Sequence, residues 1–386
     1  MPDILEALKS APRVLIEADL KPVAGSRIQP TGFPDLGPAT YEAPPSTDEQ
    51  KAQYPNGVPT LLVESAQSMA NRLEAVCWDE AADDLVPELT GLPYVRVNLA
   101  GLGDGNDTTS SLQEFHRLNS PYILQKPKDS TRTYTADRRW FRDVFRAELG
   151  LGDRAEEGEG DGEGGDIEGV VNLRRLAAVC FKYDPNSLVH GVFLEKIADR
   201  LRHPRALSAF IEATGIGRAD SGGVKFDRAL PKPKIKKLDA KEGFGNVPFH
   251  RTEFTAKTIT AYFSLDLAQI RGYALKPDAN DLLIALSLWK VRKFLDSNLR
   301  LRSACELELS NAPVMCRYKN ANRVDQVIEL DDTDILKDRI EKLITNCKPL
   351  FANPAVTEVT WSADKQTQSD EKAAKPKQPK AKKTQE

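Results

Sequence analysis

Apolar residues recur along this chain at two spacings, and these predict a mixture of strands and helices. Alternation over residues 259–267 places every second residue on one apolar face, as in a strand with one buried side. Residues 13–20 are typical of a buried strand, and the alternation returns at residues 299–309. Further strands are predicted at residues 93–99, 187–195 and 205–213.

Longer segments repeat apolar residues at the spacing of a helix. Residues 137–150 predict a helix that is capped by Asp137 and stopped by Gly150. Further helices are predicted at residues 61–74, 169–183, 278–298 and 331–346. Because strands and helices alternate irregularly, we expect an α+β fold with a mostly antiparallel sheet.

Composition and charge place these elements in one expected domain with two biased segments. The chain has 386 residues, of which 40% are apolar, and no run is long enough to span a membrane. Residues 153–168 hold eight acids and one arginine, a net −7, and predict a solvated acidic loop. Residues 362–386 hold seven lysines and four acids, a net +3, and predict a disordered tail. We therefore expect a single elaborated domain over residues 1–361, in the cytoplasm because no signal peptide is recognisable.

Several kinds of site find no support in the sequence. The five cysteines form no C-x-x-C pair, so they predict reduced thiols packed in a core rather than a zinc site. The loop after residue 100 imitates a dinucleotide fingerprint, but Asn106 stands where the third glycine belongs. No carboxylate pair has metal-ligand spacing, and we expect neither a metal nor a cofactor.

The predicted helix over residues 61–74 carries an unusual polar edge. Ser65, Ser68 and Arg72 line up beside its apolar stripe, and Asn71 lies next to them. If Ser65 caps the helix, free backbone N–H groups, hydroxyls and a guanidinium converge on one spot, which is suited to phosphate. An ordinary amphipathic helix with a solvated edge fits the same pattern.

Two further segments are candidates for contact with nucleic acid. A loop rich in glycine and proline supplies Arg27 and Gln29, with a solvated loop as the alternative. Residues 221–256 form a basic stretch that predicts a flexible insertion, although each lysine alone fits a solvated surface. Its candidate contacts are Lys232, Lys234, Lys236, Lys237 and Arg251.

A family resemblance joins these candidates. The stretch "LLVESAQSMANRLEAVCWD" resembles the RAMP-superfamily backbone subunit of type I CRISPR surveillance (Cascade) complexes, and the nearest subtype is the one first called U and later G. Five further stretches, in order along residues 13–310, resemble the same family. They are "GSRIQPTGFPDLGPATY", "SLVHGVFLEK", "RALSAFIEA", "RTEFTAKTITAYFSLDLAQIRGYAL" and "LRLRSACELE".

The resemblance implies a fold and a role. It implies an RRM-like (ferredoxin-like) core with long insertions, and several copies that stack head to tail along a guide RNA. A thumb-like insertion, here residues 221–256, displaces guide bases, and the exposed bases pair with target DNA. The polar helix edge then contacts the RNA backbone through Ser65, Ser68, Asn71 and Arg72. For His190 the sequence favours a structural role or a further backbone contact over catalysis.

The resemblance also implies partners and leaves alternatives open. The partners are a large PAM-recognising subunit, a subunit that caps the guide end, and a recruited helicase-nuclease, all acting in antiviral defence. We expect no catalysis. The leading alternative is a RAMP-type endoribonuclease that processes the guide precursor with His190 or His250 as general acid or base. A small-ligand enzyme built on the glycine loop after residue 100 is a further alternative.

Overall fold

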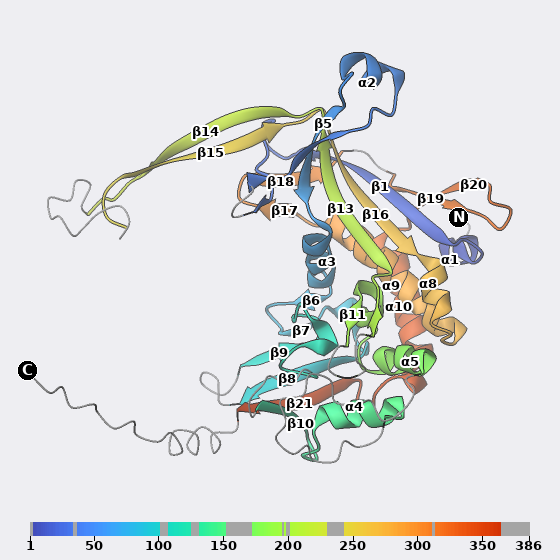
Figure 1. Cartoon of the computed structure of the whole chain (residues 1–386). Helices are drawn as coiled ribbons and strands as arrows, with labels where there is room; N and C mark the ends of the chain where they lie inside the picture. The colour runs from blue at the N-terminus through green and yellow to red at the C-terminus, as the bar shows by residue number, and fades with distance from the viewer. Residues whose placement is uncertain are drawn as a thin grey trace, which may run out of the picture. The chain divides into compact units, whose positions relative to one another are not determined.

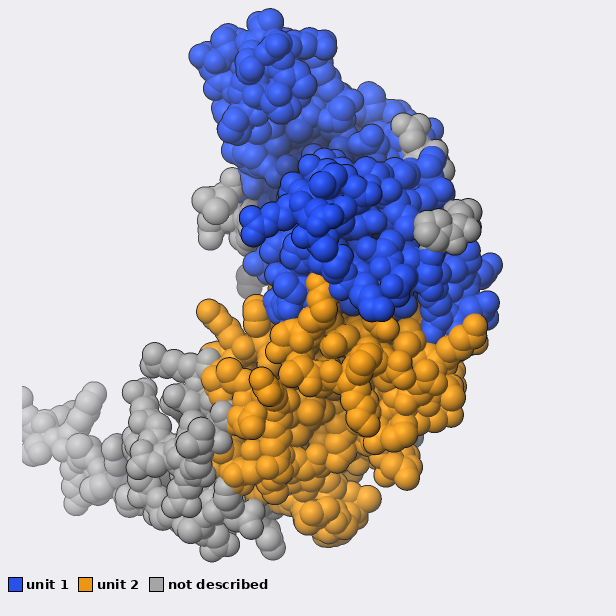
Figure 2. All heavy atoms as spheres, turned by 90° about the vertical axis from the view of Figure 1, so that its right-hand side faces the viewer, with its two compact units in different colours: residues 1–76, 206–269, 284–339 blue, residues 77–205, 270–283, 340–386 orange. Residues whose placement is uncertain are grey.

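The computed structural model describes most of the chain. The described residues are 3–33, 37–100, 107–124, 131–151, 172–194, 197, 201–229, 243–310 and 313–363. They form two compact units, shown in different colours in Figure 2. Unit 1 comprises residues 1–76, 206–269 and 284–339, and unit 2 comprises residues 77–205, 270–283 and 340–386. The single elaborated domain over residues 1–361 stays a prediction beside this division into two compact units.

The centre of unit 1 is an antiparallel sheet, as the sequence predicted. Among the described residues it has nine strands, and its main path runs β17-β18-β1-β16-β13-β5-β4. The remaining strands, β19 and β20, continue from β1 as a hairpin. The strand bounds are β1 Arg13–Pro22, β4 Thr40–Ala43, β5 Val58–Glu64, β13 Leu207–Thr214, β16 Thr258–Asp266, β17 Leu299–Arg302, β18 Cys305–Leu309, β19 Met315–Lys319 and β20 Asp325–Glu329.

The connections within this sheet give it the RRM-like, ferredoxin-like topology. The chain passes through β1, helix α3 (Ala66–Ala75), β13, β16, helix α9 (Pro277–Asp296) and then β18 and β19. Of these four strand positions, the first and third are neighbours, the second lies outside the third, and the fourth lies outside the first. This is the β-α-β-β-α-β arrangement. The predicted α+β fold with an RRM-like core is therefore confirmed, and β4 and β5 extend it beyond β13.

The alternation read from the sequence decides which face of the sheet is buried. Ile259, Ala261, Phe263 and Leu265 of β16 are each at most 5% exposed, and the Phe263 ring lies 6.3 Å from that of Phe294 on α9. On the opposite face, the side chains of Phe210 and Tyr262 stack with their ring centroids 5.1 Å apart. One face of the sheet thus forms the core with α9, because side chains along a strand point alternately to its two sides.

A long hairpin is inserted between β13 and β16. Strands β14 (Gly217–Lys225) and β15 (Val247–Thr255) pair without interruption from Gly217↔Thr255 to Lys225↔Val247. Figure 1 shows them leaving the sheet side by side as an extended arm. The insertion predicted at residues 221–256 therefore begins as a regular antiparallel hairpin. Lys232, Lys234, Lys236 and Lys237 lie outside the described residues.

Unit 2 is built around a second, smaller sheet. Its strand order is β10-β21-β8-β9, and β21 runs parallel to β8. The helices α4 and α5 pack through aromatic rings, since the ring centroids of Phe141 and Tyr183 lie 5.3 Å apart and the ring planes make an angle of 88° in an edge-on contact. The bounds are β8 Tyr94–Ala100, β9 Thr108–Ser110, β10 Thr131–Thr135, β21 Val356–Ala363, α4 Phe141–Leu149 and α5 Leu173–Tyr183.

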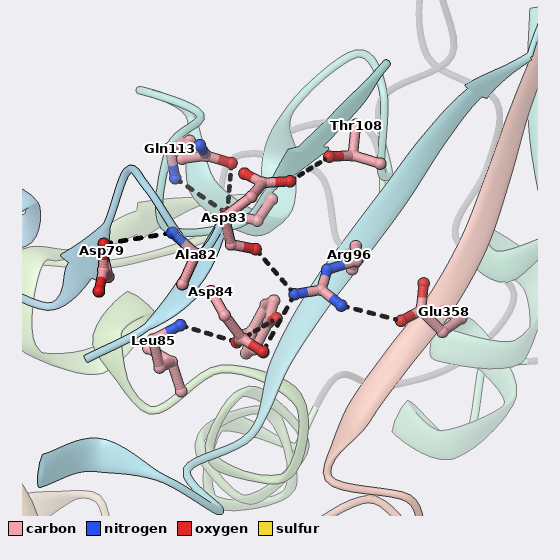
Figure 3. A network of polar contacts seen from close by, with 11 residues as sticks. Asp79, Ala82, Asp83, Asp84, Leu85, Arg96, Thr108, Gln113 and Glu358 are labelled. Atoms are coloured by element: carbon pink, nitrogen blue, oxygen red, sulfur yellow. Dashed lines mark hydrogen bonds and ion pairs between the residues drawn. The ribbon is translucent and has the colours of Figure 1, made fainter. Parts of the chain in front are cut away.

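A polar network links the small hairpin formed by β6 (Trp78–Asp79) and β7 (Asp84–Leu85) to the sheet of unit 2. In Figure 3 the Arg96 guanidinium lies 3.0 Å from the Asp83 carbonyl oxygen, 3.3 Å from the Asp84 carboxylate and 3.5 Å from that of Glu358. The Tyr94 hydroxyl donates to Asp84 at 2.8 Å. Partial burial of Asp84 works against ionisation, but the hydrogen bond from Tyr94 and the charge of Arg96 together lower its pKa. The network therefore stabilises the ionised form of Asp84.

Local signals were wrong where tertiary contacts override them. Residues 187–195 are not one strand, because α6 (Asn186–His190) and the short β11 (Val192–Phe193) occupy them. Helix α4 begins after Trp140 rather than at Asp137, whereas the predicted stop at Gly150 is confirmed by its φ of 77°. Asp137 instead receives a hydrogen bond from Arg139 at 2.6 Å.

The acidic segment 153–168 and the tail from residue 364 lie outside the described residues. No helix among the described residues is long and apolar enough to cross a membrane. All five cysteines are buried and free, as predicted. The other helices and strands are α1 Ile4–Leu8, β2 Gly32–Phe33, β3 Gly37–Pro38, α2 Asp48–Gln53, β6 Trp78–Asp79, β7 Asp84–Leu85, η1 Pro87–Leu89, η2 Arg117–Asn119, β12 Arg202–His203, α8 Leu267–Gly272, α10 Thr333–Cys347 and η4 Lys348–Leu350.

Candidate nucleic-acid interface

The polar edge predicted from the sequence lies at the junction of a strand and a helix. Residues 61–64 belong to β5, so the helix predicted from residue 61 begins only at Ala66. Ser65 is its N-cap, as predicted, and its hydroxyl oxygen accepts a hydrogen bond from the Ser68 N–H at 3.3 Å. Ser68 and Arg72 are four residues apart and therefore share one side of α3.

Arg72 is held by a buried carboxylate at the end of β5. Its Nε lies 3.4 Å from Glu64 Oε1, and the Glu64 side chain is only 1% exposed. A second guanidinium, that of Arg302 in β17, also pairs with the Glu64 carboxylate. Arg302 reaches further and donates to the Gln29 carbonyl oxygen at 3.1 Å. Glu64 therefore brings together α3, β17 and the loop that contains Gln29.

The loop at residues 27–29 is fixed to both neighbouring segments. Ile28 exchanges two backbone hydrogen bonds with Phe254 of β15, at 2.8 and 2.9 Å. The Gln29 N–H donates to the Ala304 carbonyl oxygen, in the turn after β17, at 2.8 Å. The loop is thus a bridge between the root of the β14–β15 hairpin and the β17–β18 turn.

A second buried carboxylate lies at the root of the hairpin. The Glu253 side chain is 5% exposed, and its oxygens lie 3.3 Å from Arg27 Nη1 and 2.9 Å from Arg251 Nη2. Both of its partners were candidates from the sequence, and the fold brings them to one acid. Their side chains are more exposed than those around Glu64, at 56% for Arg27 and 40% for Arg251.

We call these six residues the arginine cluster. Four arginines and two glutamates give a formal net charge of 4 − 2 = +2. Guanidinium groups bind phosphate oxygens through paired N–H donors, without reading base edges. The arginine cluster can therefore bind a phosphodiester backbone of any sequence. It comprises Arg27, Glu64, Arg72, Arg251, Glu253 and Arg302.

Three members of the arginine cluster were not predicted from the sequence: Glu64, Glu253 and Arg302. Glu64 interrupts the apolar end of a strand, which is an unusual place for an acid and the one local signal it offered. In the sequence, Arg302 is one of several polar residues that alternate with apolar ones over residues 299–309, and nothing distinguishes it from the others. Its link to Glu64 is a side-chain ion pair between residues 238 positions apart in the sequence, on two strands that do not pair with each other, and no local pattern reveals such a contact.

The other predicted contacts fall into different environments. Asn71 is exposed on α3, and Ser68 is partly buried. His190 lies in unit 2, at the end of α6, and is 1% exposed. A side chain so deeply buried has no surface to offer a ligand, so burial argues against the predicted backbone contact at His190.

His250 has the opposite character. Its side chain is 68% exposed on β15, and its Nε2 lies 3.6 Å from Asp220 Oδ1 on β14. The hydrogen bond from Arg218 lowers the pKa of Asp220 and keeps that carboxylate ionised. The described residues contain no group of three or more histidine, cysteine or acidic side chains arranged to hold a metal.

Comparisons with known proteins give one family. A sequence model described as "CRISPR-associated protein GSU0053" matches residues 14–218, which is more than half of the chain. The matched region runs from β1 to the start of β14 and includes α3. No curated protein matches the sequence.

Two solved structures share a weak likeness with the chain. One, titled "CRISPR RNA-guided surveillance complex, pre-nicking", is 14% identical, with a TM-score of 0.34 over 79% of this chain and 78% of the other. The second, titled "CRISPR RNA-guided surveillance complex", is 12% identical, with a TM-score of 0.23 over 88% of each chain. Because the family model matches more than half of the chain, the chain belongs to the CRISPR-associated protein GSU0053 family.

Proposed function

We propose that this protein is a non-catalytic, guide-RNA-binding backbone subunit of a type I-G CRISPR effector complex in the cytoplasm. The observation that carries the proposal is the arginine cluster on an RRM-like core, in a chain of a CRISPR-associated family. A subunit that must hold any guide has to contact phosphate and sugar, because the bases must stay free to pair with target DNA. Four guanidinium groups around two acids meet that requirement.

The β14–β15 hairpin supplies the second part of the proposal. Arg251 and Glu253 lie on strand β15 of this hairpin. The sequence between its two strands contains Lys232, Lys234, Lys236 and Lys237. A basic arm beside a basic site suits a guide strand that passes from the body of one subunit towards the arm. Copies of the chain then repeat head to tail along the RNA, through heterologous contacts that do not close into a ring.

In this proposal the RNA and other subunits limit the length of the assembly. The partners are guide RNA, target DNA through its pairing with the guide, a large PAM-recognising subunit, a subunit at the guide end and a recruited helicase-nuclease. The chain itself contributes phosphate contacts and no chemistry.

The test is co-expression with a CRISPR array, followed by sizing and extraction of bound RNA. The wild-type protein is expected to elute as a large oligomer with guide-length RNA. In the variant Arg27→Gln/Arg72→Gln each buried acid keeps one arginine, so the fold is preserved while two phosphate contacts are lost. The matched control is Arg13→Gln/Arg317→Gln, which removes two charges from ion pairs with Asp266 and Glu17 elsewhere in unit 1.

The amount of bound RNA distinguishes a correct proposal from a wrong one. If the cluster variant loses RNA and the control retains it, the proposal stands. If the wild-type protein remains free of RNA beside its array and partner subunits, the proposal is wrong.

One observation favours a second candidate function, the guide-processing endoribonuclease. The exposed pair of His250 and Asp220 resembles an acid–base pair, since a carboxylate can hold an imidazole for proton transfer. Incubation of the isolated protein with precursor RNA tests this candidate. Cleavage that is lost in His250→Ala would establish the enzyme, and intact precursor would exclude it.

A further inference from the structure

The two glutamates of the arginine cluster are in an unusual position for a site that attracts RNA. Their side chains are 1% and 5% exposed, whereas those of the four arginines range from 22% to 56%. A carboxylate is costly to bury unless cations pair with it, and here each carboxylate pairs with two. The acids therefore lie beneath the arginines rather than beside them.

This layering restricts how the arginines move. A free arginine side chain samples many rotamers and loses about 2 kcal/mol of rotamer entropy when a ligand fixes it. Arg72 is held by the Glu64 carboxylate and by the Leu301 carbonyl oxygen, and Arg302 by the same carboxylate and by Gln29. Part of that entropy is thus lost on folding, before RNA arrives.

We propose that Glu64 and Glu253 are positioning residues for RNA: each carboxylate orients two guanidinium groups so that their remaining N–H donors face the phosphate backbone. The inference rests on the proposed function. The loop at residues 27–29 joins the two halves into one site, because Arg302 donates to Gln29 while Ile28 pairs with Phe254, the neighbour of Glu253. Each guanidinium has five N–H donors, so those not used by the acids and carbonyls stay available.

Net charge and arginine orientation predict opposite changes in RNA affinity when one of these glutamates is neutralised. Glu64→Gln removes a negative charge and raises the formal charge of the arginine cluster from +2 to +3. If attraction between net charges governs binding, RNA affinity rises. If orientation of the arginines governs binding, affinity falls, because a neutral amide binds a guanidinium less strongly than a carboxylate does.

The experiment measures binding of labelled single-stranded RNA of mixed sequence by fluorescence anisotropy over a range of salt concentrations. Glu64→Gln and Glu253→Gln are each expected to weaken binding about tenfold and to reduce the salt dependence by about one phosphate contact. The matched control is Glu308→Gln, whose side chain is 51% exposed and pairs with Lys21 on the sheet. This control is expected to bind as the wild-type protein does, or slightly more tightly.

A cycle of variants separates positioning from general loss of stability. In an Arg72→Gln background, where Glu64 still pairs with Arg302, Glu64→Gln is expected to weaken RNA binding by less than it does in the wild-type protein, because one arginine rather than two remains for it to orient. A merely structural role would lower the melting temperature and leave the salt dependence of the folded protein unchanged. If Glu64→Gln does not fold, Glu253→Gln carries the test alone, since its arginines are the more exposed pair.

Each possible binding result leads to a different conclusion about the positioning role and the proposed function. Unchanged or tighter RNA binding by both variants would overturn the positioning role while leaving the proposed function intact. Absence of RNA binding by the wild-type protein would overturn the proposed function itself, and the positioning role with it. Weaker RNA binding with a smaller salt dependence in the glutamate variants, together with no loss of binding in Glu308→Gln, supports the inference.

Discussion

Arg27→Gln is the most informative single change in the proposed RNA site. Arg27 is 56% exposed and lies 3.3 Å from Glu253, and Arg251 pairs with the same carboxylate at 2.9 Å. When Arg27 is replaced, Glu253 keeps a partner, so the fold avoids the penalty of an unpaired buried charge. The loss should therefore fall on RNA binding rather than on stability.

The magnitude follows from counterion release. On a single strand, each phosphate neutralised contributes about −0.7 to the slope of log affinity against log salt. With about one contact for each of the four arginines, the wild-type slope is about −2.8, and a fourfold rise in salt weakens binding about fiftyfold. For Arg27→Gln the slope becomes about −2.1 and the same rise costs about twentyfold. At low salt we expect about tenfold weaker binding, as for one charge-assisted contact.

Arg13→Gln provides a closely matched comparison. Arg13 is also 56% exposed and forms one ion pair, with Asp266 at 3.1 Å. Both substitutions change the protein's net charge by one unit, so a long-range field affects them equally. Fluorescence anisotropy over a salt series measures the slope for both. Equal slopes for the two variants would refute the reasoning, because the effect would then be one of total charge.

Three further predictions concern stability and the helix cap. Phe263→Ala is expected to lower the free energy of unfolding by about 3–5 kcal/mol in a denaturant titration, whereas Phe249→Ala, at a side chain 40% exposed, should cost far less. Ser65→Ala should lower it by about 1 kcal/mol through loss of the cap, and Ser65→Asp should restore stability yet weaken RNA binding, because an acid caps a helix but repels phosphate. Because the folded pKa of Asp84 is lowered, its stabilising contribution is complete above the ordinary value of 3.8 and is lost as pH falls through the folded pKa. Acid unfolding of Asp84→Asn should therefore show a smaller loss of stability below about pH 4 than that of the wild-type protein.

Much of the fold could be read from the sequence because its cause is local. Residues 13–20 were predicted as a buried strand and the alternation over residues 259–267 predicted a strand with one buried side; these are β1 and β16, and in the structure both have one buried face. Where the cause was not local, the reading was wrong. His190 lies in a segment whose apolar residues fit a strand, but every residue of α6 is buried, so its pattern carried no periodicity to read.

The candidate site shows the same division. The sequence by itself determined the helix cap, which is Ser65 with the N–H of Ser68, and the chemical groups of the site, which are the arginines at the positions predicted to bind RNA. Only the tertiary structure decided which of them act together, because Glu64 meets Arg302 across 238 residues and Glu253 meets Arg27 through a paired loop. Glu64 and Arg302 lie on strands that do not pair with each other, so their contact is set by the packing of the whole core rather than by either residue's neighbours in sequence.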